Sequence, residues 1–172
     1  MADAPTTPAE GEMPKVPSLR ILTQFIKDLS FENPSFTEAS RSQKPPNIDL
    51  GIDVQARTLS PDTYEVTLNF SARAVAEDEA VVFIAELAYA GVFQMANISD
   101  ADREPFLLIE CPRMIFPFAR RILADVTRDG GFPPLMLDPV DFANLYRAQL
   151  AKRAAAAQGA ETNGNGDPAA AN

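Results

Sequence analysis

The segment TYEVTLNFSARA, residues 63–74, decides the fold because its side chains alternate in polarity along its whole length. Every second residue is apolar, and the residues between them are polar. The apolar set is Tyr64, Val66, Leu68, Phe70, Ala72 and Ala74. Successive side chains of a β-strand point to opposite faces of a sheet, so this period of two predicts a long strand that is buried on one face.

A second segment with the same period lies upstream, in NIDLGIDVQA at residues 47–56. Its apolar members alternate with polar residues or glycine, and they are Ile48, Leu50, Ile52, Val54 and Ala56. The residues Ser60, Pro61 and Asp62 between the two segments favour a tight turn. A turn of that length predicts that the two strands pair in antiparallel fashion.

Two more strands are predicted, one before this pair and one after it. In LRILTQFIKDLSFE, residues 19–32, the alternation is interrupted near Lys27, which favours a bulge or a bend there. The acidic turn at residues 77–79 leads into AVVFIAELAYAGVFQM, residues 80–95, which is apolar on both faces. Such a strand is normally covered on both sides, so we expect residues 81–93 to form core and, in part, an interface between copies of the chain.

The second half of the chain changes to a helical period. Phe118, Ile122 and Val126 recur at intervals of four, which predicts a helix. Pro117 suits the first turn of this helix, and the Asp-Gly-Gly sequence of residues 129–131 suits its end.

A second helix is predicted after the linker FPPLMLDP, residues 132–139. Asp138 suits the N-cap, Pro139 suits the first helical position, and Asp141 adds a favourable negative charge in the first turn. One side of this helix then carries an apolar stripe. The stripe consists of Phe142, Leu145, Tyr146 and Leu150.

These elements predict an α+β fold in which a four-stranded antiparallel sheet is followed by two helices on one side. Two helices can cover only one face of such a sheet, so we expect the chain to associate with itself. We assign residues 18–153 to this domain. The proline-rich residues 1–17 are predicted to be a disordered N-terminal tail, and residues 154–172, which lack large apolar side chains, a flexible C-terminal tail.

The composition excludes several classes of function. The net charge is −9, with 24 acidic and 15 basic residues, which argues against a surface for nucleic acid or anionic membrane. There is no histidine and only one cysteine, Cys111, so His-based catalytic pairs, His-containing metal sites and intrachain disulfides are excluded. We predict no catalytic residue, no metal and no cofactor, and we interpret Cys111 as a small buried residue.

The sequence also bears on location. It has neither the basic start and apolar stretch of a secretory signal nor the roughly 20 apolar residues that span a bilayer. We therefore expect a soluble cytoplasmic protein without membrane insertion. An enzyme that uses paired carboxylates stays open on composition alone, because acidic residues are plentiful.

Six stretches of the chain match, in order, those of a known family. They are KDLSFENP at 27–34, NIDLGIDV at 47–54, YEVTL at 64–68, AGVF at 90–93, CPRMIFPFAR at 111–120 and GGFPPLMLDPVDFANLY at 130–146. On these residues the chain resembles the SecB family of protein-export chaperones. The resemblance implies a homotetramer, arranged as a dimer of dimers, that holds unfolded secretory precursors in the cytosol without ATP and delivers them to the motor SecA. The alternative is a SecB-like chaperone dedicated to a single partner, such as an antitoxin.

The alternation in KDLSFENP places Asp28, Ser30 and Glu32 on one face of a strand. From the residues alone, these side chains are most simply a solvated strand face. The resemblance implies instead that they form the docking surface for SecA, whose binding segment in this family is cationic and carries its own zinc. By the same resemblance, Glu79 in the acidic turn joins this surface.

Seven apolar residues carry two interpretations, and they are Phe25, Ile48, Leu50, Ile52, Phe142, Leu145 and Tyr146. Taken singly, each is most simply a core residue. The resemblance implies that they line an apolar groove for extended precursor segments. Each buried apolar side chain contributes roughly 1.5–3 kcal/mol, so several grooves acting on one long chain give tight binding without sequence specificity.

Overall fold

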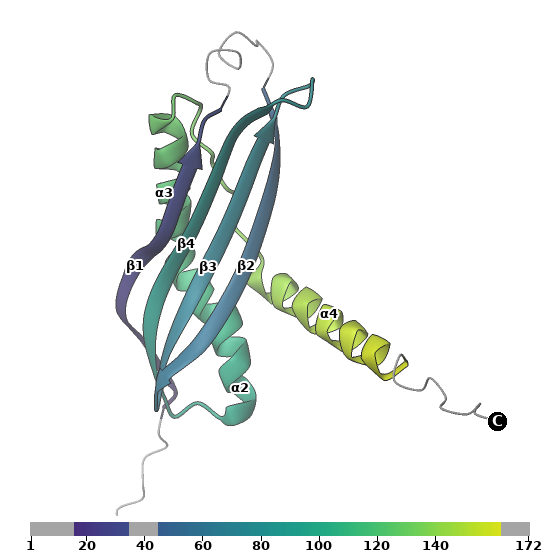
Figure 1. Ribbon diagram of the computed structural model, residues 1–172. Helices are drawn as coiled ribbons and strands as arrows, with labels where there is room; N and C mark the ends of the chain where they lie inside the picture. Colours follow the sequence, from purple (N-terminus) through teal and green to yellow (C-terminus); the bar gives the residue numbers. More distant parts are fainter. Residues whose placement is uncertain (1–15, 35–44, 163–172) are drawn as a thin grey trace, which may run out of the picture.

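The computed structural model describes residues 16–34 and 45–162, and these form a four-stranded antiparallel sheet with helices on one side (Figure 1). The strands are β1 (Ser18–Glu32), β2 (Asn47–Ser60), β3 (Thr63–Val75) and β4 (Val81–Ala96). They lie in the order β1-β4-β3-β2, and each neighbouring pair is antiparallel. The predicted α+β fold is confirmed. Of the two predicted tails, residues 1–15 and 163–172 lie outside the described part of the chain.

The two faces of the sheet differ in what covers them. On β3, Phe70 packs against Phe116 of the long helix α3 (Cys111–Asp129), with ring centroids 6.2 Å apart. We call the face that carries Phe70 the helix face, and the opposite face, which none of the described helices covers, the open face (Figure 1). Residues paired across neighbouring strands point to the same side, so the register assigns each strand residue to one of these faces.

Strand β1 departs from regular alternation at two places. Its register against β4 shifts between Ile21 and Thr23 and again between Ile26 and Asp28, so Lys27 is the extra residue at the second place. The predicted interruption near Lys27 is therefore confirmed. Because each bulge shifts the alternation by one residue, Phe25 lies opposite Ala90 on the open face.

Both hairpin turns lie where the sequence predicts them. Asp62 takes a φ of 61° between β2 and β3, and Glu79 takes a φ of 64° between β3 and β4. Aspartate adopts this left-handed conformation more readily than most residues, which explains its use in the tighter turn. The predicted antiparallel pairing of residues 47–56 with residues 63–74 is confirmed.

The helical half begins earlier than the sequence predicts. Helix α2 (Asp100–Pro105), the π-helix η1 (Phe106–Glu110) and α3 follow one another without a break. The prediction that Pro117 opens a helix is wrong, because Pro117 lies inside α3 and Pro112 occupies its first turn. Pro117 lies on the exposed side of α3, and Arg113, whose carbonyl loses its helical hydrogen bond to a proline four residues later, is exposed as well.

The side of α3 that packs on the sheet is not the predicted stripe. Phe118 is exposed, and Ile122 and Val126 are only half-buried. The buried residues are instead Cys111, Pro112, Ile115, Phe116, Ala119, Leu123 and Thr127. Both sets share the helical period, so the sequence predicts the helix without showing which of its sides is buried. The end of α3 at residues 129–131 agrees with the prediction, since α3 stops at Asp129 and Gly131 takes a φ of 89°.

Helix α4 (Phe142–Thr162) starts later than predicted. Asp141 caps it, because its Oδ1 accepts a hydrogen bond of 3.0 Å from the backbone N–H of Asn144. Asp138 and Pro139 therefore lie in the linker and not at the start of the helix. Both aspartates suit an N-cap by residue type, so the sequence alone does not separate them. At its other end α4 continues past residue 153, where we placed the end of the domain.

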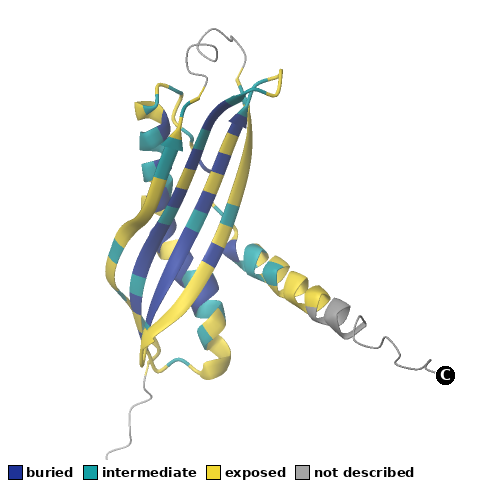
Figure 2. Ribbon diagram, viewed as in Figure 1, coloured by how far each residue is buried: buried dark blue, intermediate teal, exposed yellow. Residues whose placement is uncertain are grey.

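The core lies between the helix face and α3, and Figure 2 shows buried residues concentrated on β3, β4 and α3. Gly91 on β4 permits this close packing. A Cβ atom there would lie 2.7 Å from the ring of Phe93 and 3.0 Å from Cγ2 of Ile115. None of the helices described is long and apolar enough to cross a membrane.

Candidate partner and client surfaces

The structure brings the three predicted β1 residues together on the open face. Asp28 is paired with Ala88, Ser30 with Glu86, and Glu32 with Ile84. Asp28, Glu32 and Glu86 are exposed, whereas Ser30 is half-buried. The pairing therefore adds Glu86 of β4 to the acidic group.

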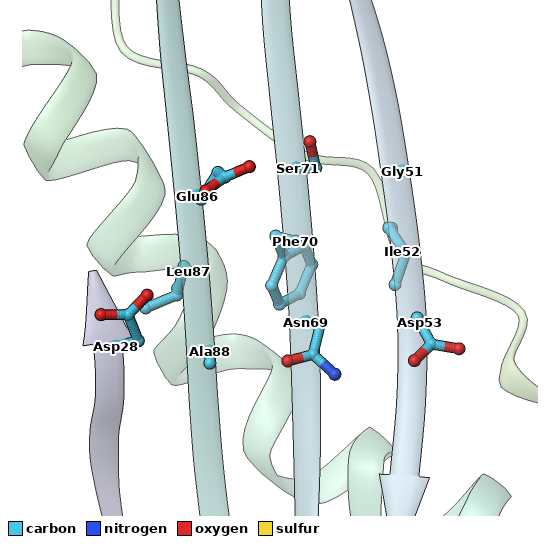
Figure 3. Close-up of a pocket in the computed structure, with 10 residues that line it drawn as sticks. All are labelled: Asp28, Gly51, Ile52, Asp53, Asn69, Phe70, Ser71, Glu86, Leu87 and Ala88. Atoms are coloured by element: carbon cyan, nitrogen blue, oxygen red, sulfur yellow. The ribbon is translucent and has the colours of Figure 1, made fainter. Parts of the chain in front are cut away.

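Asp28 and Glu86 border a depression on the open face with a volume of about 440 Å³ (Figure 3). Asp28, Glu86 and Asp53 contribute its carboxylates from three different strands, with Asn69 and Ser71 of β3 between them. Oδ1 of Asp53 also accepts a hydrogen bond of 3.1 Å from the side-chain amide of a glutamine on α4. The depression thus spans all four strands and carries carboxylates from three of them.

Sequence reasoning missed Glu86 and Asp53, although both left a signal. Glu86 is the one charged residue in the apolar run at residues 80–95. Asp53 belongs to the polar set that alternates along residues 47–56. Which acids lie near one another depends on the order of the strands in the sheet. The local periodicity of the sequence does not reveal that this order is β1-β4-β3-β2.

Glu79 lies at the end of the open face and not among the other acids. The last pair that β1 makes is Glu32 with Ile84, while the β3–β4 ladder continues as far as Val75 with Val81. Three residues of a strand correspond to about 10 Å, so the turn that holds Glu79 extends beyond the end of β1. Glu79 is exposed there.

Farther along the open face, Glu65 of β3 is a buried carboxylate that binds two cations. Its side chain is only 5% exposed. Lys27 donates to Oε1 at 2.7 Å, and Arg57 donates from Nε to Oε1 at 3.0 Å and from Nη2 to Oε2 at 2.7 Å. These hydrogen bonds, first from Arg57 and then from Lys27, lower the pKa of Glu65 to about 2.

Three of the predicted groove residues form a strip along β2. Ile48, Leu50 and Ile52 are paired with Ala74, Ala72 and Phe70, so all three lie on the helix face. Helix α3 lies behind β4 and β3 (Figure 1), and Ile48 and Leu50 remain 38% and 37% exposed. The strip is therefore apolar surface beside the core rather than within it.

Helix α4 carries three more of the predicted groove residues, Phe142, Leu145 and Tyr146. Phe142 is buried, with its ring edge-on to Phe116 at 5.8 Å between centroids, so it belongs to the core. Leu145 and Tyr146 are half-buried against the same cluster, and Leu150 is exposed. α4 reaches β2 directly through the hydrogen bond to Asp53.

Phe25 does not lie with the other predicted groove residues. Its pairing with Ala90 places it on the open face, whereas the strip on β2 is on the helix face. The bulge at Lys27 causes this separation, because regular alternation from Leu29 would have put Phe25 on the helix face.

The chemistry of the described residues contains no obvious reactive centre. Cys111 is fully buried, and its burial raises the pKa of the thiol to about 12, which leaves it protonated and unreactive. Within residues 16–34 and 45–162, no group of three or more acidic or cysteine side chains is placed to hold a metal ion.

Comparison with known proteins decides the family. The family model described as preprotein translocase subunit SecB matches residues 12–153. The chain belongs to the SecB family. It is 69% identical to the protein-export protein SecB of Maricaulis maris over the full length of both chains. It is 53% identical to that of Hyphomonas neptunium, over 92% of this chain and 93% of the relative, and 47% identical to that of Caulobacter vibrioides, over 87% and 91%.

A solved structure supports the fold of this SecB. The Mycobacterium tuberculosis Rv1957 SecB-like chaperone, solved in complex with a ChAD peptide from the Rv1956 HigA1 antitoxin, aligns with a TM-score of 0.60. The alignment covers 71% of this chain and 90% of the other, at 13% identity, so it shows a shared fold.

Membership in the family settles the class of function. The chain is a cytoplasmic protein-export chaperone and not an enzyme, which excludes the carboxylate enzyme that composition left open. It also sets aside the alternative of a chaperone dedicated to one antitoxin. The family implies binding of precursor proteins and of SecA.

Proposed function

We propose that the two surfaces divide the work of this chaperone: the acidic open face binds SecA, and the apolar strip on the helix face binds unfolded precursor. The observation that carries this proposal is their placement on opposite faces of one sheet. Ligands on opposite faces do not compete for the same residues. A SecB loaded with precursor can therefore dock on SecA without first releasing its cargo.

The SecA surface consists of Asp28, Ser30 and Glu32, extended by Glu86 and ending at Glu79. A cationic segment of SecA is the complementary partner for these carboxylates. Opposite charges 4 Å apart attract by about 1 kcal/mol in water and about 4 kcal/mol near a protein surface, so several such contacts give useful affinity. Because exposed charges are screened within about 8 Å at physiological ionic strength, this binding is expected to weaken with salt.

The precursor surface consists of Ile48, Leu50 and Ile52 on β2 and of Leu145 and Tyr146 on α4. Phe142 supports this strip from within the core. Phe25 would contact a precursor only if the extended chain also passed over the open face. Apolar surface binds any segment with enough apolar side chains, which suits a chaperone with many clients.

We further propose the homotetramer, a dimer of dimers, with residues 18–153 as its folded unit and the two ends of the chain as tails. Two uncovered features support self-association. β1 is a 15-residue edge strand with no described strand on its outer side, and such an edge is a template for pairing with a second chain. α3 exposes Met114 and Phe118, one helical turn apart, on the side away from the sheet.

The test is a binding experiment with both partners at once. Purified SecB is mixed with a urea-unfolded precursor, and SecA is then titrated while light scattering after size exclusion gives the mass of each complex. We expect a tetramer that carries precursor and SecA together. Displacement of precursor as SecA binds, in equal amounts, would show that the two ligands share a surface and would refute the proposal.

A further inference from the structure

The charges of the open face are divided between its two ends. By the register, Asp28, Glu32, Asp49, Asp53 and Glu86 lie toward the end where β1 stops, and Arg73, paired with Asp49 and Ile84, is a cation that lies among them. Lys27 and Arg57 lie toward the other end, where Glu65 of β3 is paired with Val92. Lys27 and Arg57 thus lie apart from the acids, whereas Arg73 lies among them.

Lys27 is the cation best placed to neutralise Asp28. It is the bulged residue of β1, so it directly precedes Asp28, and the side chains of both residues lie on the open face. Yet the ammonium of Lys27 does not turn toward Asp28. It extends across β4 to reach Glu65 on β3, at 2.7 Å.

The residues of β4 at this crossing are small. Ala88 and Ala90 are the open-face residues of β4 beside the bulge, and their methyl groups leave room for a long side chain to pass over the strand. Arg57 approaches Glu65 from β2 on the opposite flank and binds both carboxylate oxygens. One buried carboxylate thus holds a cation from each edge strand.

We propose that Glu65 is a positioning residue that holds Lys27 and Arg57 away from the acidic end of the open face, so that Asp28 and Glu86 stay available to a cationic partner. This inference rests on the proposed function, in which that partner is SecA. Without the Glu65 carboxylate, Lys27 is released beside Asp28 and competes with the partner for it. Glu65 itself touches no partner.

The experiment compares three variants with two probes. Glu65→Gln removes the carboxylate and changes the net charge from −9 to −8. Asp129→Asn makes the same change in charge at the end of α3, away from the open face. The double variant Glu65→Gln with Lys27→Gln has the net charge of the wild type. The probes are hexalysine and SecA, each titrated by calorimetry at low and at physiological salt.

We expect Glu65→Gln to weaken binding of both probes by about threefold at low salt, as for the loss of one surface ion pair, and to flatten the salt dependence. Asp129→Asn should change binding by less than half of that. The double variant should return to wild-type affinity, because the competing ammonium is gone. Circular dichroism and retained precursor binding show that each variant is folded.

Each possible outcome either supports or overturns the positioning role of Glu65. If Glu65→Gln binds hexalysine as Asp129→Asn does, or if removing Lys27 fails to restore binding, Glu65 has only a structural role and the inference is overturned. If hexalysine binding follows the expected pattern while SecA binds all variants equally, the positioning role stands and the proposed docking of SecA on this face fails.

Discussion

The two faces of this sheet are built from the same strands and differ only in which alternate residues they carry. On the helix face, neighbouring positions of β3 and β4 hold Leu68, Phe70 and Phe93, all buried beneath α3. On the open face, the intervening positions hold Thr67, Asn69 and other small or polar residues. The proposed precursor surface lies on the helix face at β2, where the apolar pattern continues beyond the cover that α3 provides. The proposed precursor surface is thus apolar pattern that extends past its helical cover, whereas the acidic surface lies on a face that none of the described helices covers.

The largest contrast between the faces is expected in stability. Leu68→Ala on the helix face removes a fully buried side chain, and we expect it to lower the free energy of unfolding by about 2–5 kcal/mol. Asn69→Ala, the next residue on the open face, should cost less than about 1 kcal/mol. Urea denaturation measures both. Equal losses would mean that the open face is packed as well as the helix face.

The second-largest effect is expected from substitutions in the precursor surface. Leu50→Glu combined with Tyr146→Glu places charges in the apolar strip, and we expect affinity for unfolded precursor to fall by at least about tenfold, given roughly 1.5–3 kcal/mol for each apolar side chain. Suppression of aggregation of a refolding protein measures this. Gln55→Glu, which adds a charge to the open face of the same strand, is the matched control. Normal holding by a folded double variant would remove these residues from the client site.

The acidic surface should give a smaller effect and one that depends on salt. Asp28→Ala with Glu32→Ala removes two exposed carboxylates, and we expect about tenfold weaker SecA binding at low salt with precursor binding unchanged. Titration calorimetry at two salt concentrations measures it. Asp100→Ala with Asp129→Ala removes the same charge away from the open face and should leave SecA binding intact. SecA affinity that is unchanged at low salt in the first variant would contradict the assignment.

The smallest expected effect is the pH dependence that Glu65 brings to folding. Its pKa lies at about 2 in the folded protein, below the ordinary value of 4.5, so its ion pairs stabilise the fold above pH 4.5 and lose this contribution as the pH falls toward 2. We expect a contribution on the order of 1 kcal/mol, because Lys27 and Arg57 are largely exposed. Urea denaturation should therefore separate wild type from Glu65→Gln at pH 7 and bring them together near pH 2. A constant gap across this range would exclude the ion pairs as its source.

The sequence predicts the sheet well because polarity along a strand reports directly on which side faces the core. The alternation at residues 63–74 and the interruption at Lys27 both correspond to what the register shows. The sequence predicts that helices are present but not the residues at which they start. Pro117 and Asp138 carry signals for helix starts, but burial elsewhere along the chain placed the starts at Asp100 and Phe142.

The candidate surfaces could be predicted only in part. Asp28, Ser30 and Glu32 share a face because they lie on one strand, and local alternation is enough to show that. Glu86 joins them through pairing between strands far apart in the chain, which no local pattern contains. Phe25 shows the opposite problem, since a one-residue bulge moved it to the other face.

The bulge at Lys27 also divides β1 into two halves with opposite parity. Downstream of it, even-numbered residues face the open side; immediately upstream, odd-numbered ones do, as Phe25 shows. A deletion of Lys27 would place Ile26 directly before Asp28, just as Tyr89 and Ala88 are consecutive on β4, so it would remove the bulge while Phe25, Ile26 and Asp28 keep their faces. The extra residue thus gives the two halves of one edge strand opposite alternation in the sequence while both halves stay paired with β4.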